Sequence, residues 1–96
     1  MSEPKNFEEA CLIVVEEIAS LVISKQHDYG HRNILDFGEI GILVRVNDKV
    51  ERLKNLKDKQ PINETVDDNW GDLAGYSIIA LMLRRGWFQL DLSGEI

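Results

Sequence analysis

Three acidic residues stand four positions apart in the last third of the chain: Glu64, Asp68 and Asp72. In an α-helix a step of four residues turns the side chain by only about 40°, so the three carboxylates project from nearly one side. Divalent cations such as Mg²⁺ take oxygen ligands of this kind and can activate a bound water. The stripe predicts a metal site with Asp68 and Asp72 as candidate catalytic residues, although a solvated acidic face explains the spacing alone equally well.

Asp72 is followed by leucine, alanine and glycine, so its carboxylate lies in an otherwise apolar stretch. A carboxylate buried there needs a partner, because an unpaired buried charge is costly. The preceding segment supplies two acids that extend the predicted metal site and two cations: Asp48, Glu51, Arg45 and Arg52. The alternative is a purely structural salt bridge from Arg52 to Asp48 or to Asp68.

Between residues 25 and 38 the apolar periodicity stops, which predicts a loop rich in hydrogen-bonding groups. Such loops often carry binding residues. Lys25 and Arg32 suit phosphate oxygens, and Tyr29 suits stacking on a nucleobase. His27 and His31 also stand four apart, but outside a helix this spacing is more typical of surface histidines than of a metal pair. The candidate ligand-binding residues are Lys25, His27, Asp28, Tyr29, Arg32, Asn33, Arg45 and Arg52.

The charge balance restricts the kinds of partner. The 96 residues include 11 Lys and Arg against 17 Asp and Glu, for a formal net charge of -6. Nucleic-acid polymers and anionic membranes need clustered cations to neutralise their phosphates, so we expect neither as a partner. A small phosphate ligand is compatible with this charge, because a bound Mg²⁺ reverses the local sign of the field.

The single cysteine and the short apolar runs predict the cellular compartment. Its single cysteine, Cys11, falls on the expected apolar face of the first helix, so we expect a buried, inert thiol in a reducing environment. The first residues do not form a secretion signal, and the longest apolar run, residues 11–15, is far too short to span a membrane. We therefore expect a cytoplasmic protein.

Apolar residues at three- and four-residue steps predict three helices, over residues 7–26, 37–57 and 64–85, followed by a short tail. Their combined length suits one compact all-α domain over residues 1–96. Asn6 and Asp36 are the expected N-caps of the first two helices, and Gly86 is expected just beyond the third. The first helix is apolar around much of its circumference, which predicts a homo-oligomer.

Further expectations concern packing. A connection of about six residues favours antiparallel packing of the second and third helices. The inward-facing residues expected on the second helix are Leu43, Val46, Val50 and Leu53. Gly71 and Gly75, inside the third helix, are expected to let another helix approach closely or to leave room for a ligand beside Asp72. Trp87 and Phe88 are expected to pack back on the bundle.

Three stretches of the chain together resemble a known family. They are Lys25…Asp28-Tyr29-Gly30…Asn33…Phe37-Gly38, the run from Arg45 to Leu53, and Glu64…Asp68…Asp72-Leu73-Ala74-Gly75-Tyr76. Their order and spacing resemble the nucleotide modification associated domain, type 1, a small family frequent in bacteriophages. The resemblance covers about residues 25–83 and implies a nucleotide ligand.

That family in turn resembles the all-α nucleoside triphosphate pyrophosphatases of the MazG and dimeric dUTPase type. In those enzymes EExxE and ExxD motifs hold Mg²⁺ on two helices. The stretch from Asp68 to Leu73 is similar to their EELGDL sequence, with Asp72 in the place of its aspartate, but Asn69 stands where the glutamate of ExxD would be. Asp48 with Glu51, and the pair Glu16-Glu17, each give only part of EExxE.

Three functions follow as hypotheses. The first is an Mg²⁺-dependent hydrolase that converts a nucleoside triphosphate to the monophosphate and pyrophosphate, with metal ligands drawn from Asp48, Glu51, Glu64, Asp68 and Asp72. The second is a non-catalytic oligomeric sponge that sequesters a nucleotide, for instance a host immune signalling molecule. The third is a helical interaction module whose acids are merely solvated.

Overall fold

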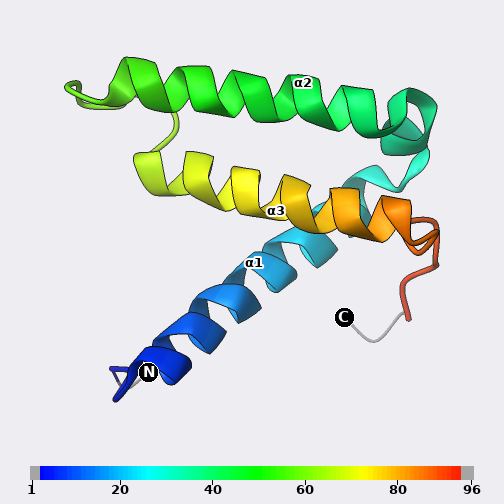
Figure 1. Ribbon diagram of the computed structural model, residues 1–96, viewed down its shortest axis with the longest axis horizontal. Helices are drawn as coiled ribbons and strands as arrows, with labels where there is room; N and C mark the ends of the chain where they lie inside the picture. The colour runs from blue at the N-terminus through cyan, green and yellow to red at the C-terminus, as the bar shows by residue number, and fades with distance from the viewer. Residues whose placement is uncertain (1–2, 94–96) are drawn as a thin grey trace.

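The computed structural model describes residues 3–93, which fold into three helices with no β-strand (Figure 1). Helix α1 spans Phe7–Tyr29, α2 spans Arg32–Leu56 and α3 spans Val66–Arg84. The predicted all-α class is therefore confirmed. Helices α2 and α3 run antiparallel side by side, while α1 crosses beneath α3 at a steep angle. No helix among the described residues is long and apolar enough to cross a membrane.

The helix ends follow local capping chemistry. Asn6 caps α1, because its side-chain oxygen accepts a hydrogen bond from the backbone N–H of Glu9 at 2.8 Å. At α3 the Thr65 hydroxyl accepts from the Asp68 N–H at 2.9 Å, and the Asp68 carboxylate accepts from the Thr65 N–H at 3.1 Å. This reciprocal capping box fixes where α3 begins. Beyond its end, Gly86 has a positive φ of 73°, as predicted for a terminating glycine.

The predicted loop over residues 25–38 is wrong. Helix α1 continues to Tyr29 and α2 already begins at Arg32, so only Gly30 and His31 separate them. Exposed polar side chains are compatible with a helix, so they do not end α1. Gly30 ends it, because its φ of 68° is a conformation that residues with a side chain rarely adopt. Asp36 consequently lies inside α2 and is not its cap. A second left-handed glycine, Gly38 with a φ of 63°, kinks α2 where the sequence had suggested a start.

The core lies between α2, α3 and the segment after α3. Its buried hydrophobic residues among those described are Ile34, Ile42 and Phe88, and Phe88 packs back on the bundle as predicted. On α2 the expected inward position of Leu43 is wrong, because its side chain is 56% exposed. The stripe that faces α3 runs through Ile42 and Val46 instead, which places Leu43 one residue, or about 100°, off it.

Helix α1 meets α3 where α3 carries its two glycines. A side chain at Gly71 would contact Ile18 and Leu21, and one at Gly75 would lie 3.3 Å from Val22. The glycines therefore permit the close crossing that the sequence suggested. Only the carboxyl-terminal half of α1 takes part, and none of its residues is buried. Cys11 is exposed, so its predicted burial is wrong for this chain.

Substitution of these two glycines should have opposite effects on stability. Gly71→Ala should raise the free energy of unfolding by up to about 1 kcal/mol, because alanine is the better helix former and its methyl group meets only ordinary contacts, 3.7 and 3.9 Å away. Gly75→Val should lower it by about 1–3 kcal/mol through overpacking against Val22. Urea unfolding followed by circular dichroism measures both values. A destabilising Gly71→Ala would contradict this description of the crossing.

Candidate functional site

Asp72 joins all three helices through two ion pairs. Its Oδ2 lies 2.8 Å from Nζ of Lys49 on α2, and its Oδ1 lies 2.9 Å from Nζ of Lys25 on α1. The side chains of Asp72 and Lys49 are only 12% and 11% exposed, whereas Lys25 is 49% exposed. The buried carboxylate thus has the partners that it needs, but they are two lysines and not Arg45 or Arg52.

Lys49 also holds the first member of the acidic stripe. Its Nζ donates to both carboxylate oxygens of Glu64, at 3.3 and 3.4 Å, and Arg52 binds the same carboxylate from the outside. Arg52 therefore pairs with Glu64, and neither predicted pairing of Arg52, with Asp48 or with Asp68, is formed. The five residues Lys25, Lys49, Arg52, Glu64 and Asp72 form what we call the ion cluster.

Sequence reasoning missed Lys49, although a signal existed. Ile42, Val46, Lys49 and Leu53 recur at steps of four, three and four residues, so the lysine occupies a position in the apolar stripe of α2. A lysine in such a stripe is rarely buried without an acid opposite. Asp72, an acid in an apolar stretch of the next helix, was the complementary feature.

The ion cluster favours the charged form of both buried partners. Burial alone raises the pKa of Asp72, but hydrogen bonds from Lys49 and Lys25 outweigh it, so the pKa lies below its ordinary value. Burial likewise lowers the pKa of Lys49, yet the hydrogen bonds to Asp72 and Glu64 raise it above its ordinary value. Both groups are therefore ionised at neutral pH.

The residues proposed as metal ligands do not fit a shared Mg²⁺ ion. Asp72 and Glu64 already accept from ammonium groups, and Asp68 is exposed and caps α3. Glu51 pairs with Lys54 at 3.4 Å, and Asp48 is exposed on α2. Across residues 3–93 no three His, Cys, Asp or Glu side chains gather as metal ligands would.

Asn69, in the place of the ExxD glutamate, is fully buried and donates to the Thr65 carbonyl.

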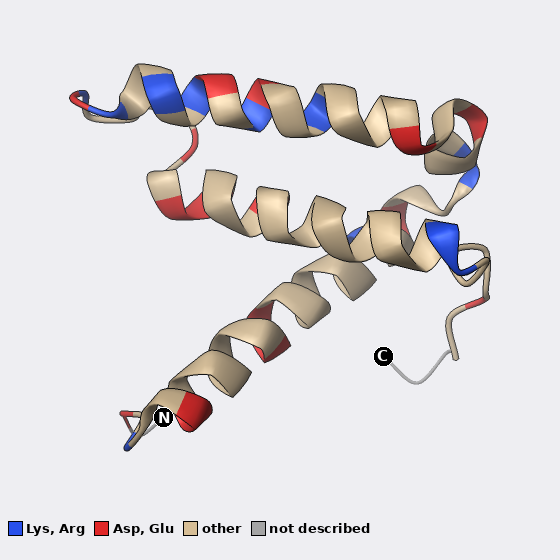
Figure 2. Ribbon diagram, in the orientation of Figure 1, with Lys and Arg blue, Asp and Glu red and all other residues tan. Residues whose placement is uncertain are grey.

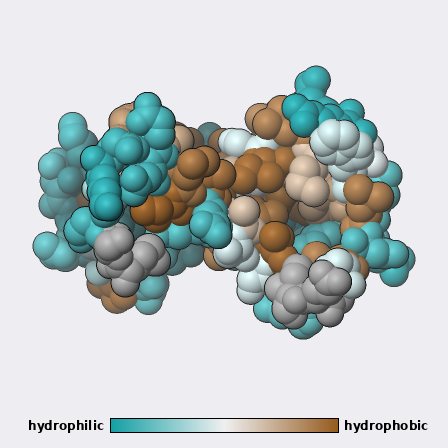
Figure 3. Space-filling view, turned by 90° about the horizontal axis from the view of Figure 1, so that it is seen from below, coloured by the Kyte–Doolittle hydropathy of each residue, from teal (hydrophilic) through white to brown (hydrophobic). Residues whose placement is uncertain are grey.

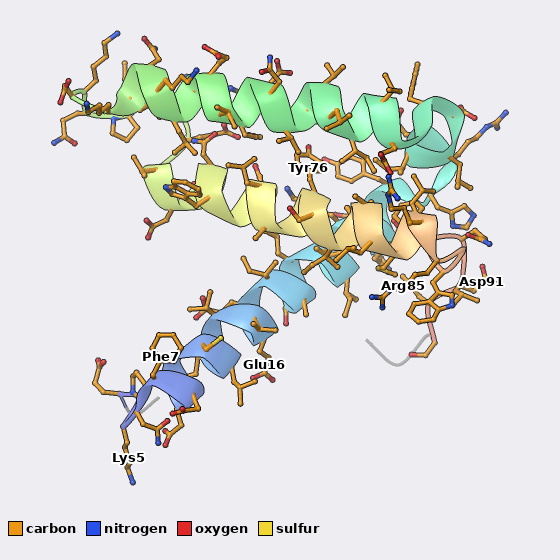
Figure 4. All side chains as sticks on the ribbon, viewed as in Figure 1. Lys5, Phe7, Glu16, Tyr76, Arg85 and Asp91 are labelled. Atoms are coloured by element: carbon orange, nitrogen blue, oxygen red, sulfur yellow. The ribbon has the colours of Figure 1, made fainter. Side chains whose placement is uncertain are left out.

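A cleft of about 260 Å³ opens beside the ion cluster, with Lys25 and Asp72 in its wall. Figure 4 shows Tyr76 between α3 and α2, where it forms part of this wall. Arg45 also lines the cleft, is half-buried, and has no acidic partner among residues 3–93. The remaining lining is mostly apolar, with several polar groups: Leu21, Val22, Gln26, Tyr29, Gly30, Asn33, Ile34, Gly75, Ile79 and Phe88.

The cleft brings together half of the predicted ligand-binding residues. Lys25, Tyr29, Asn33 and Arg45 all line it. The other four lie elsewhere: Arg32 is exposed on α2, His27 and Asp28 contact each other at 3.2 Å on the surface, and Arg52 borders a separate hollow at the α2–α3 connection. Gln26 and Tyr76 were not predicted as ligand-binding residues, although each follows a cleft residue by four positions.

Residues 25–83 match the family described as Nucleotide modification associated domain 1. This chain belongs to that family. The matched region is more than half of the 96 residues. It contains all of α2 and all of α3 except its last residue, with the ion cluster and Arg45, but only the end of α1. No curated protein and no solved structure matches the chain.

Removing Lys49 should destabilise the fold strongly. Lys49→Met leaves the Asp72 carboxylate without its buried partner and should lower the free energy of unfolding by about 3 kcal/mol. Adding Asp72→Leu to that variant should restore most of the loss, because an apolar pair of similar volume replaces the charged one. The control is Lys54→Met, since Lys54 is 70% exposed and its pair with Glu51 should contribute little. Equal losses in Lys49→Met and Lys54→Met would contradict this.

Acid should weaken the contribution of Asp72. Because the folded-state pKa is lowered, the stabilisation is present in full above the ordinary value of 3.8 and is lost as pH falls through the folded-state pKa. The difference in unfolding free energy between the unaltered chain and Asp72→Asn should therefore shrink below that pH. Urea unfolding at a series of pH values measures it. A difference that grows on acidification would mean that Asp72 is neutral in the fold.

Proposed function

We propose that this protein binds a nucleotide in the cleft and retains it without a metal ion. The observation that carries the proposal is Arg45, a half-buried guanidinium in the cleft wall that no acid among residues 3–93 neutralises. Arg presents two parallel N–H donors to phosphate oxygens, which is the strongest common form of phosphate recognition. Membership of a nucleotide modification associated family supports the same ligand class.

The local charge of the cleft supports a phosphate despite the acidic chain. Arg45 and Lys25 contribute two positive charges and Asp72 one negative charge, with the buried Lys49 directly behind it. Lys25 is half-exposed, so its ammonium group can contact a phosphate while it remains beside Asp72. Figure 2 shows that Lys and Arg concentrate on α2, while α1 carries acids along its length. The cationic side of the cleft therefore comes from α2 and from the end of α1.

The rest of the cleft suits the base. Ile34, Ile79 and Phe88 form an apolar surface, and Tyr29, which is 76% exposed, stands at the rim where its ring can stack on a base. A volume of about 260 Å³ is just below the ~300–1,000 Å³ typical of ligand sites. We infer that the ligand is a single nucleotide, with a phosphate against Arg45 and Lys25.

Hydrolysis of a nucleoside triphosphate to the monophosphate and pyrophosphate is the second candidate, and one observation favours it. Asp72, which matches the aspartate of the EELGDL sequence, lines the same cleft. Because Asp72 is held by two ammonium groups, capture of an intact nucleotide agrees better with the site. That the protein comes from a phage, and that the captured nucleotide is a host immune signalling molecule, stay predictions.

Isothermal titration with a panel of linear and cyclic nucleotides tests binding. In excess EDTA we expect at least one nucleotide to bind, and Arg45→Gln should weaken it about 10- to 100-fold, the effect of losing a charge-assisted hydrogen bond. Arg32→Gln is the matched control, because Arg32 is exposed and lies outside the cleft. The affinity of this variant for the nucleotide should be unchanged. Failure of the whole panel to bind in EDTA would refute the proposal, whether or not a nucleotide binds when Mg²⁺ is added.

Mass spectrometry after incubation with Mg²⁺ separates the two candidates. Intact nucleotide recovered after denaturation supports capture. Release of the monophosphate and pyrophosphate, lost in Asp72→Asn, would instead establish the hydrolase.

A further inference from the structure

A hollow of about 570 Å³ lies at the connection between α2 and α3. It is separate from the cleft, because the two share no lining residue. Figure 3 shows mostly hydrophilic side chains at the left end of the molecule, where Figure 1 places this connection. The wall of the hollow carries two cations, several side-chain amides and a few aliphatic groups, and none of the described residues that line it is aromatic.

Asn69 lines this hollow from α3 and has an unused hydrogen-bond acceptor. Its side chain is fully buried, and its Oδ1 accepts no hydrogen bond from any described residue. Its Nδ2 donates to the Thr65 carbonyl at 2.9 Å, so exchanging the two amide atoms would bring two acceptors together. Oδ1 therefore lies on the side of the amide group turned away from the backbone of α3. Because a buried acceptor without a donor costs stability, we expect an occupant of the hollow to supply one.

Two exposed cations in the wall suit an anion. Arg52 contacts Glu64 through Nη1 and is 55% exposed, so its guanidinium has further N–H donors for a second oxyanion. Lys59 donates to Oδ1 of Asn55 at 3.2 Å and is also exposed. Glu64, the acid of the lining, is already held by Lys49 on its other side. The wall is therefore net positive and suits a phosphate group.

We propose that the hollow binds a small phosphate ester with several hydroxyl groups, such as a sugar or sugar-alcohol phosphate. Arg52 and Lys59 hold the phosphate, and a hydroxyl donates to Oδ1 of Asn69. An ionised phosphate group offers only acceptors, so the donor comes from the rest of the ligand.

The remaining lining fits the same class of ligand. The side chains of Asn55, Gln60 and Asn63 can both donate and accept, as hydroxyl groups do. Without an aromatic ring in the wall there is no surface on which a base can stack, so this ligand differs from the nucleotide proposed for the cleft. The volume of about 570 Å³ falls within the ~300–1,000 Å³ typical of ligand sites.

Titration of the nitrogen-15-labelled, unaltered protein with sorbitol 6-phosphate tests the proposal. We expect saturable shifts of the amide signals of residues 59–64 and of the side-chain amide of Asn69. Inorganic phosphate, which has no sugar hydroxyls, should bind at least about 10-fold more weakly, and uncharged sorbitol more weakly still. Absence of shifts with sorbitol 6-phosphate, or shifts confined to residues of the cleft, would overturn the proposal. Because the two sets of signals are separate, the result does not depend on nucleotide binding.

A lysine variant and a matched control test the anion contact. Lys59→Gln should weaken binding of sorbitol 6-phosphate about 10-fold, the effect of losing a charge-assisted hydrogen bond. Lys57→Gln removes the same charge from an exposed position outside the hollow, and its affinity should be unchanged. Equal affinities in the two variants would contradict the proposal.

Asn69→Leu tests the acceptor, with circular dichroism to check that the helices are kept. The variant should bind sorbitol 6-phosphate no more tightly than inorganic phosphate, because the hydroxyl no longer has its partner. A folded Asn69→Leu that keeps the full preference for sorbitol 6-phosphate would overturn the proposal. If the variant does not fold, the two lysine variants and the ligand comparison in the unaltered chain decide.

Discussion

The buried ion pair between Lys49 and Asp72 is the constraint on which the arrangement of α2 and α3 depends. Neither charge is stable in the apolar contact without the other, because an unpaired buried ion costs several kcal/mol. A slip of α3 by one helical turn, about 5.4 Å, would separate the two atoms that now lie 2.8 Å apart. The pair therefore fixes the register of the two helices, and Lys25 extends the same constraint to α1.

The cleft follows from that register. Arg45 stands one turn before Lys49 on α2, and Tyr76 stands one turn after Asp72 on α3, so both lie beside the pair in the cleft wall. The pair also decides the chemistry available there. The lysines pair with the carboxylates of Glu64 and Asp72, so Arg45 is a cation of the cleft wall that has no acidic partner among residues 3–93, and the half-exposed Lys25 lines the same cleft. A cleft built in this way is suited to holding phosphate, and the acids serve mainly to hold the cations in place.

The sequence predicted features that depend on local chemistry. Asn6 as the cap of α1, Gly86 beyond α3 and the three-helix class all follow from short-range spacing, and the structure confirms them. The predicted end of α1 is wrong because polar side chains do not end a helix, whereas Gly30 does. The exposure of Cys11 depends on where α1 leaves α3, which periodicity does not encode. Lys49 was not predicted, because the partner of a charged residue in an apolar stripe can be named only once the residues on the facing helix are known.

We propose that lysines, and not a metal ion, neutralise Glu64 and Asp72 in the ion cluster beside the cleft. Titration of the nitrogen-15-labelled, nucleotide-free protein with Mn²⁺ tests it most directly, through paramagnetic broadening of amide signals. We expect the signals of Glu64 and of residues 71–73 to keep their intensity, and to broaden selectively in Lys49→Met, where both carboxylates lose that ammonium group. Selective broadening around Asp72 in the unaltered protein would contradict the claim.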